Sequence, residues 1–362
     1  MKRVLKIAGI LLLAVLAAVL CYVGYVFGTY SRIEDNQELS VTHGSSGVQT
    51  AEPETDYKIL SWNIGFGAYE EDFGFFMDGG TESRAWSRDR LKKNLDAIGE
   101  TAAAQDADLM LLQEVDFDSD RSYHVDEALK LRTFDGLDVS TDSVFAVNYH
   151  SAYLFYPITQ PHGASNSGLL TTSKLGIRSA VRRSLPVETG VTKLLDLDRC
   201  YSVSKIPVSN GKALCLYNLH LSAYTSDGKI ADEQLELLLS DMQAEYEAGN
   251  YVIGGDFNKD LLEGGSEAYF GVSTEDYTWA QPLRFDLLEK TDIRLIAPQG
   301  KDGAVPTVRN ADGPYHDGQL VLSVDGFLVS PNVEVTDSEV VSTGFAYSDH
   351  NPICMSVTLL AQ

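Results

Sequence analysis

The sequence predicts an α/β protein in which β-sheets are sandwiched between helices, with one membrane-spanning helix in front of them. Three observations indicate this class. Short β-rich runs recur between residues 58 and 360, and several are continuous apolar runs, typical of strands covered by another layer. Two amphipathic helical patterns lie between these runs. A long uncharged apolar segment lies near the N-terminus.

The first thirty residues predict the membrane-spanning helix. Three basic residues (Lys2, Arg3 and Lys6) precede an apolar run of 21 residues, Ile7 to Phe27, which is long enough to cross a hydrocarbon core of about 30 Å. The run is longer than the apolar part of a cleaved signal peptide, and no small-residue cleavage site follows it. We therefore expect residues 1–30 to be an uncleaved, single-pass signal anchor. Its basic end would stay in the cytoplasm, which puts the rest of the chain on the extracytoplasmic side of the cell membrane.

The remaining chain predicts a linker and one domain. Residues 31–55 are polar, contain Gly-Ser-Ser-Gly and carry few apolar side chains, so we expect a flexible linker there. Residues 56–362 show no internal repeat. Helices are expected over 88–105 and 231–249, where leucines and isoleucines recur at helical spacing. Strands are expected over 58–64, 109–115, 143–149, 167–173, 199–208, 212–221, 251–257, 320–330 and 353–360.

The cysteines do not predict a disulfide scaffold. Cys200 and Cys215 flank Asn210-Gly211, a dipeptide typical of a hairpin turn. Pairing about that turn puts Cys200 opposite residues near 219, several positions from Cys215 and beyond disulfide reach. We expect both, together with Cys354, to be small buried apolar side chains.

Composition and charge exclude several classes of protein. A hydrophobic fraction of 44% over 362 residues supports a large core and excludes wholesale disorder. The net charge is −24, and residues 56–362 alone carry 24 basic and 47 acidic residues, or −23. A domain of this charge repels polyanions at long range, which argues against tight non-specific binding of nucleic acid.

Polar side chains gather at the ends of the expected strands, where they can converge on a cleft. A single histidine in a strand is usually a structural side chain, and an Asp near an Asn is usually part of a turn. Carboxylates, amides and imidazoles at six strand ends together form a set that a fold does not need for stability. These candidates are Asn63, Glu114, His220, Asp256, Asn258, Asp325, Asp349 and His350.

Six motifs around these residues carry a family resemblance. In chain order they are SWNIG (61–65), LLQEVD (111–116), NLHLSA (218–223), GGDFN (254–258), VDGFLVS (324–330) and SDHNPI (348–353). With all six in this order, the chain resembles the endonuclease/exonuclease/phosphatase superfamily, which includes deoxyribonuclease I, neutral sphingomyelinases and inositol-polyphosphate 5-phosphatases. The resemblance implies a catalytic domain over 56–362, built as a four-layer α/β sandwich of two packed mixed β-sheets flanked by helices. It also implies a hydrolase that acts on phosphate esters.

The resemblance assigns a cofactor to part of the set. Glu114 would be the main protein ligand of Mg²⁺ or Mn²⁺, with Asn63 and Asp349 beside it, directly or through metal-bound water. A hard cation of this kind takes oxygen ligands and keeps several waters, so one or two protein carboxylates suffice.

Catalytic roles follow from the same resemblance. Asp256, held by Asn258, would orient or deprotonate the attacking water. His350 would donate to a phosphoryl oxygen and be oriented by the carboxylate of Asp325. His220 would contact the scissile phosphate or assist the leaving oxygen.

Three substrate classes remain open. A membrane anchor raises the local concentration of lipid, which favours phospholipid headgroups, and small phosphoesters are also compatible with the set. Ala223 stands where some nuclease members place a phosphate-contacting Asn, which argues against an abasic-site endonuclease. Because metal-dependent nucleases can be acidic, an extracellular nuclease of the deoxyribonuclease I type is the alternative. A catalytically silent binding module is less favoured, because Glu114, Asp256 and His350 are all present. No obligate protein partner is evident.

Two segments have an open interpretation. The Gly-rich and aromatic insert at 65–80 is either a substrate lid at the rim of the site or an ordinary surface loop. The segment 148–168 places aromatic residues beside His150 and His162 and either contacts a ligand or belongs to the core.

Overall fold

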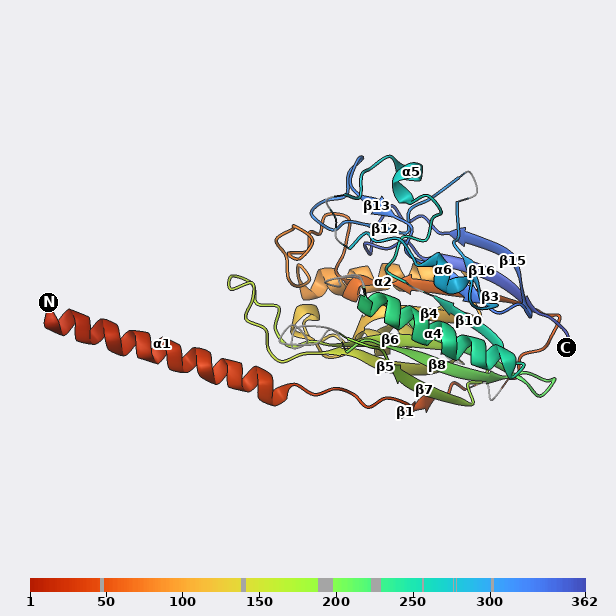
Figure 1. Cartoon of the computed structure of the whole chain (residues 1–362), viewed down its shortest axis with the longest axis horizontal. Helices are drawn as coiled ribbons and strands as arrows, with labels where there is room; N and C mark the ends of the chain where they lie inside the picture. Colours follow the sequence, from red (N-terminus) through yellow and green to blue (C-terminus); the bar gives the residue numbers. More distant parts are fainter. Residues whose placement is uncertain are drawn as a thin grey trace.

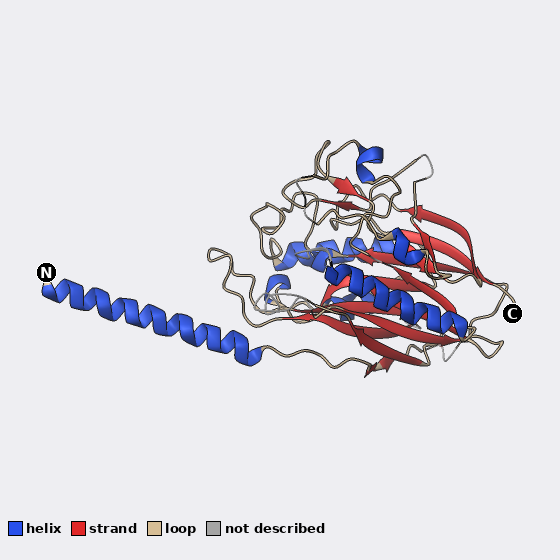
Figure 2. Ribbon diagram, viewed as in Figure 1, coloured by secondary structure: helices blue, strands red, loops and turns tan. Residues whose placement is uncertain are grey.

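The structure is a computed structural model, and it describes residues 1–45, 49–137, 141–187, 198–222, 229–255, 257–275, 277, 279–300 and 303–362. Within these residues, two seven-stranded mixed sheets pack face to face, and helices cover their outer faces (Figures 1 and 2). The predicted four-layer α/β sandwich is therefore confirmed.

Each sheet combines antiparallel pairs with one parallel pair of neighbouring strands. In the first sheet the parallel pair is β3 with β4, and in the second it is β9 with β10. The first sheet has the order β15 (Val333–Val340), β16 (Ile353–Leu359), β3 (Asp56–Asn63), β4 (Leu109–Asp116), β6 (Asn166–Ser173), β5 (Asp142–His150) and β2 (Val41–Thr42). The second has the order β1 (Gln37–Leu39), β7 (Ser179–Ser184), β8 (Cys200–Pro207), β9 (Ala213–Leu219), β10 (Tyr251–Gly255), β14 (Phe327–Val329) and β11 (Arg294–Ile296).

Successive side chains of the central strands enter different layers of the core. On β3, Ile59 belongs to the cluster between the two sheets, whereas Leu60 packs with the helix α2 (Arg88–Ala103). On β10, Ile253 faces the other sheet and Val252 packs with α4 (Lys229–Glu247). Because both faces of these strands are buried, their sequences read as continuous apolar runs.

The helix α2 shows how the sequence fixes an element of the outer layer. Ser87 lies in an extended conformation before the helix, and its Oγ accepts a hydrogen bond from the backbone N–H of Arg90 at 3.2 Å, which satisfies one of the first free donors. The side chains at helical spacing form one stripe toward the sheet. The buried members of this stripe are Leu91, Leu95, Ile98 and Ala102.

Several smaller elements complete the fold. They are the helices α3 (Glu127–Arg132), α5 (Ser266–Phe270) and α6 (Phe285–Leu288), the single turns η1 (Gly65–Gly67) and η2 (Asp120–Ser122), and the two-stranded sheet of β12 (Val308–Arg309) and β13 (Val321–Leu322).

The expected single strand over 320–330 is wrong, because the segment divides into β13 and β14. Between them, the backbone N–H groups of Val324 and Asp325 donate to Oγ1 of Thr307 instead of to a neighbouring strand. The segment also passes close to another strand at Gly326, where an added Cβ would lie 2.9 Å from the carbonyl oxygen of Ile296. This interruption lets the Asp325 side chain leave the sheet.

The hairpin and cysteine predictions are confirmed. The strands β8 and β9 pair antiparallel about Asn210-Gly211, with Tyr201 opposite Leu219. All four cysteines are free thiols, and Cys200, Cys215 and Cys354 are buried.

The N-terminal segment forms one apolar helix, α1 (Lys2–Thr29), which extends away from the domain (Figure 1). None of its residues is buried by protein, and its most apolar window has a mean hydropathy of 2.8. Its length and composition suffice to cross a membrane, and a signal sequence at the N-terminus would share both properties.

The expectation of a flexible linker over 31–55 differs from the structure. The strand β1 pairs with β7 and β2 pairs with β5, so this segment adds an edge strand to each sheet. Both oxygens of the Asp198 carboxylate accept hydrogen bonds from it, from Arg32 Nε at 3.0 Å and from the backbone N–H of Ile33 at 2.7 Å. The composition of residues 31–55 did not predict this order, because the hydrogen bonds that hold the segment come from partner strands elsewhere in the chain. The folded domain therefore includes residues before Asp56.

We predict that a fragment of residues 31–362 melts at a higher temperature than one of residues 56–362. Deleting 31–55 removes two edge strands and the hydrogen bonds to the largely buried Asp198. A loss of about 2 kcal/mol, a modest estimate for these contacts, lowers the melting temperature by roughly 4 °C in a domain of this size. Circular dichroism melts of both fragments measure the difference. Equal melting temperatures would show that the segment contributes no stability.

Candidate active site

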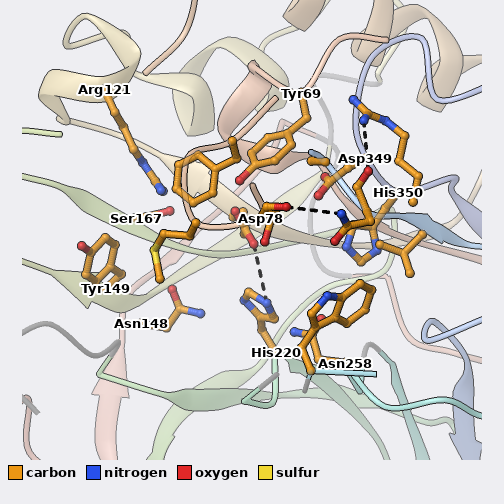
Figure 3. A pocket seen from close by; sticks show the side chains of 18 of the residues that line it. Tyr69, Asp78, Arg121, Asn148, Tyr149, Ser167, His220, Asn258, Asp349 and His350 are labelled. Carbon is orange, nitrogen blue, oxygen red and sulfur yellow. Dashed lines mark hydrogen bonds and ion pairs between the residues drawn. The ribbon is translucent and has the colours of Figure 1, made fainter. Parts of the chain in front are cut away.

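The candidate site lies where the two parallel strand pairs end. β3 ends at Asn63, and Glu114 lies near the end of β4 in the first sheet. His220 directly follows β9, and the predicted Asp256 directly follows β10 in the second sheet. A cavity of about 260 Å³ opens at these ends. Five predicted residues line it, and Figure 3 shows four of them labelled; the five are Glu114, His220, Asn258, Asp349 and His350.

A β-bulge directs Glu114 into the cavity. The register of β4 against β6 shifts between Leu112 and Val115, and Glu114 has a positive φ of 53°. A bulge turns the local side chain out of the regular alternation, and a positive φ at a residue other than glycine is tolerated only where the surroundings hold it. The Oε1 atom of Glu114 accepts a hydrogen bond of 3.2 Å from Nδ2 of Asn63. The Oδ1 atom of Asn63 is already bonded to the backbone N–H of Gly65 at 3.0 Å, so in this arrangement Asn63 orients the carboxylate.

His220 comes from the opposite sheet and meets the same carboxylate. Its Nε2 lies 3.7 Å from Oε1 of Glu114, as the dashed line in Figure 3 marks. Burial, together with the positive charges of Arg199 and His350, lowers the pKa of His220 well below its ordinary value. Its Nδ1 is buried and has no hydrogen-bond partner among the described residues. His220 is therefore a neutral imidazole with an unused polar atom beside the cavity.

The turn that carries Asp349 and His350 is fastened to the end of β3. The hydroxyl of Ser348 donates to the carbonyl oxygen of Asn63 at 2.8 Å, and Nε1 of Trp62 donates to the carbonyl oxygen of His350 at 2.9 Å. These bonds join residues almost 290 positions apart in the chain. They bring Asp349 and His350 to the cavity beside Glu114.

Asp325 and His350 form a buried pair. The Nδ1 atom of His350 donates to Oδ2 of Asp325 at 2.9 Å, and both side chains are at most 5% exposed. A carboxylate in this position fixes the ring orientation and stabilises a protonated imidazole. The structure thus brings these two predicted residues into the predicted contact.

Asn258 also lies at the cavity, and Asp256 lies outside the described residues. The Nδ2 atom of Asn258 donates to the carbonyl oxygen of Leu221 at 2.9 Å, which ties the segment after β10 to the segment after β9. The predicted role of Asp256 stays a prediction.

The donor set fits a hard cation held through few protein ligands. Across the described part of the chain, no group of three or more His, Cys, Asp or Glu side chains is spaced to hold a metal. Mg²⁺ does not need such a cluster, because it binds through one or two carboxylates, waters and substrate phosphate. Burial raises the pKa of Asp349 to about 6, and the negative charge of Glu114 contributes to this rise. A bound cation would relieve that unfavourable charge, so Glu114 and Asp349 are the residues that would hold it.

The other half of the cavity is built from residues outside the predicted set. Arg121 makes two hydrogen bonds to Asp116, at 3.0 and 2.8 Å, and lies over the ring of Phe66 at 4.0 Å. Two buried polar atoms at the cavity, Nδ2 of Asn148 and Oγ of Ser167, have no hydrogen-bond partner among the described residues. Figure 3 shows these side chains on the side of the cavity away from His350. Asn148 and Ser167 fall within the segment 148–168 that the sequence left open, whereas Arg121 lies five residues after the LLQEVD motif and carried no signal of its own.

Both segments with an open interpretation contribute side chains to the cavity. Tyr69, Phe75, Met77 and Asp78 of the 65–80 insert line the cavity, so this insert is part of its rim. His162 also lines the cavity, whereas His150 lies against Asp198, with 3.5 Å between Nε2 and Oδ2.

Comparisons with known proteins agree with this fold. A family model described as the Endonuclease/Exonuclease/phosphatase family matches residues 60–350. Among solved structures, the endonuclease/exonuclease/phosphatase of Beutenbergia cavernae is 17% identical with a TM-score of 0.56, over 84% of this chain and 72% of that chain. ANGEL2, a 2′,3′-cyclic phosphatase seen with adenosine-2′,3′-vanadate, is 15% identical with a TM-score of 0.55, over 90% and 99%. The human Nocturnin catalytic domain is 14% identical with a TM-score of 0.52, over 88% and 96%. None of the curated protein sequences compared with the chain matches it significantly.

We predict that His162 makes stability fall as the pH drops below about 6.5. Burial, with a contribution from the charge of Arg121, lowers its pKa from 6.5 to about 4. Between pH 6.5 and pH 4, His162 therefore binds a proton in the unfolded chain but not in the folded chain. Its contribution to the free energy of unfolding is fully present above pH 6.5 and is lost toward pH 4, by up to about 3 kcal/mol. Melting temperatures of wild type and His162→Gln at pH 7 and pH 4.5 measure this. The variant should lose less between the two pH values, and an identical loss would contradict the prediction.

Proposed function

The chain belongs to the endonuclease/exonuclease/phosphatase family, and we propose that it is a Mg²⁺-dependent phosphoesterase tethered to the extracytoplasmic side of the cell membrane. Enzymes of this family hydrolyse phosphate esters, so the predicted enzyme class is confirmed at the level of the family. The proposed substrates are phospholipid headgroups or small phosphoesters. The observation that carries the proposal is the convergence of Glu114, His220 and the Asp325–His350 pair on one cavity.

The proposed reaction is an in-line displacement by water at phosphorus. Glu114 and Asp349 would hold Mg²⁺, whose chemistry when bound is to offset the charge that develops on the non-bridging oxygens. His350 donates a hydrogen bond from Nε2 to a phosphoryl oxygen, and Asp325 stabilises the proton that this ring carries. His220 offers a neutral imidazole to the scissile phosphate or the leaving oxygen. Asp256 would orient the water.

The tether and the charge support this substrate range over long nucleic acid. α1 has the length and composition of a membrane anchor. The charge of −23 on residues 56–362 repels polyanions. At the cavity itself, the Arg121 guanidinium is already bonded to Asp116.

We predict that Glu114→Gln lowers turnover of bis-p-nitrophenyl phosphate at least 100-fold at limiting Mg²⁺, and that EDTA abolishes turnover by wild type. The amide keeps the shape of the side chain and removes the charge that would hold the cation. Titration calorimetry with Mg²⁺ alone should show weaker binding by the variant. Glu247→Gln is the control, because Glu247 is exposed on α4. Full turnover in EDTA would remove this mechanism.

We predict that His350→Ala lowers kcat by about 100-fold or more, which is typical of losing a pre-organised donor. Asp325→Asn should give a smaller loss, because the amide can still contact Nδ1 but does not stabilise the protonated ring. Circular dichroism should show both variants folded. Near-normal kcat in the alanine variant would contradict the assigned role.

We predict that the full-length protein in vesicles outperforms the fragment 31–362 on phospholipid substrates, whereas both cleave a soluble diester equally. The anchor raises the effective concentration of lipid without a new contact in the cavity. A nuclease of the deoxyribonuclease I type should instead gain nothing from the anchor, and added salt should speed its cleavage of DNA. Degradation of plasmid DNA with no turnover of any phospholipid would favour that alternative.

A further inference from the structure

We propose that a loop beside α1 inserts into the bilayer interface and holds the cavity toward the membrane. The loop comprises residues 151–163, between β5 and β6, and we call it the interface loop. The proposal rests on the proposed membrane anchoring by α1. It adds a second membrane contact, and with it an orientation of the catalytic domain.

The interface loop is in direct contact with the last turns of α1. The hydroxyl of Tyr22 donates to the carbonyl oxygen of Tyr153 at 3.0 Å, and the backbone N–H of Tyr153 donates to the hydroxyl of Tyr25 at 3.3 Å. The rings of Tyr22 and Phe155 meet edge to face, with centroids 5.1 Å apart. In Figure 1 the yellow-green loop projects from the domain on the side where α1 leaves it.

These contacts set the depth of the loop if α1 spans the bilayer. Tyr22 lies five residues before Phe27, the end of the uncharged apolar run, which corresponds to about 7.5 Å along a helix. Interfacial apolar side chains sit about 5–10 Å deep, at the boundary of headgroups and acyl chains. Tyrosine is enriched at this boundary, because its ring is apolar and its hydroxyl is polar. The loop that touches Tyr22 therefore lies at interfacial depth.

The surface of the loop suits this environment. Phe155, Tyr156 and Ile158 are 56%, 68% and 86% exposed. Single exposed apolar residues are common, but three within four positions form a patch that water solvates poorly. Residues 151–163 contain no Asp, Glu, Lys or Arg, although the domain around them carries −23. A patch without negative charge adds no repulsion from anionic headgroups, unlike the acidic side chains elsewhere on the domain.

The same loop is joined to the rim of the cavity. The ring of Phe76 packs against Tyr156, with centroids 5.7 Å apart, and against His162 at 6.4 Å. His162 and Met77 line the cavity, and Met77 is also 60% exposed. An apolar surface thus continues from the interface loop to the cavity mouth. A lipid phosphate could reach the cavity without leaving the interface.

The test measures the depth of the loop without measuring activity. Full-length Ile158→Trp is reconstituted in phosphatidylcholine vesicles with and without lipids brominated on their acyl chains. The added tryptophan should be quenched by brominated lipid beyond the wild-type level, which the three native tryptophans set. Tyr269→Trp is the matched control, because Tyr269 is 52% exposed on α5, far from α1 in Figure 1. Quenching no greater than that of Tyr269→Trp would overturn the proposal.

A second measurement connects the loop to substrate access. Ile158→Ser should lower the ratio of phospholipid turnover to soluble diester turnover by roughly tenfold, because it removes apolar contact worth about 1.4 kcal/mol. An unchanged ratio would overturn the role in access. Self-association of the full-length chain through the loop, with no quenching by lipid, would identify a second copy as the occupant and overturn the membrane contact. Absence of any phosphoester turnover, with strong quenching, would instead refute only the proposed function.

Discussion

The two sheets are joined beneath the cavity by a buried hydrogen bond between side chains. Nε2 of Gln113 on β4 donates to Oδ1 of Asn218 on β9 at 2.9 Å, and Nδ2 of Asn218 donates back to the carbonyl oxygens of Leu112 and Leu170 at 3.3 and 3.1 Å. Neither amide side chain is exposed, and a buried polar group without a partner costs about 1–3 kcal/mol. The sheets therefore favour a packing that pairs Nε2 of Gln113 with Oδ1 of Asn218. Glu114 and His220 follow these residues by one and two positions, which is why they meet at 3.7 Å.

The connections between the strands also bring the candidate residues together. A parallel strand pair needs a crossover, and here α2 connects β3 to β4 while α4 connects β9 to β10. Both helices pack on the outer faces of their sheets, so the inner faces are available to each other. Polar side chains placed after the parallel strands consequently collect at one edge of the sandwich. The buried pair of Asp325 and His350 joins them from antiparallel elements, through the interruption between β13 and β14.

The sequence predicted the elements that are buried on both faces and missed those that depend on partners. The central strands and the helices α2 and α4 can be predicted from their own sequences, because the side chains on their packed faces are apolar. The strand β7 contains the fully buried Arg182, which bonds to the carbonyl oxygens of Val147 and Asp198, so its sequence looks polar. In the site, motif residues were predictable from type and order. The roles of Arg121, Asn148 and Ser167 were not, because only the tertiary fold brings η2 and the ends of β5 and β6 together at the cavity.

In the proposed membrane-anchored state, charge and anchoring would act together on this domain. A body of −23 held near an anionic leaflet is repelled over most of its surface, and the repulsion decays within a Debye length of about 8 Å at physiological salt. One tether would leave such a body free to rotate away from the membrane. The proposed contact through residues 151–163, which contain no Asp, Glu, Lys or Arg, would change this balance because it adds apolar attraction without adding charge repulsion. An acidic surface would then be compatible with a membrane substrate, because repulsion disfavours orientations that turn charged surface to the bilayer, whereas the loop would favour the orientation that brings the cavity rim to it.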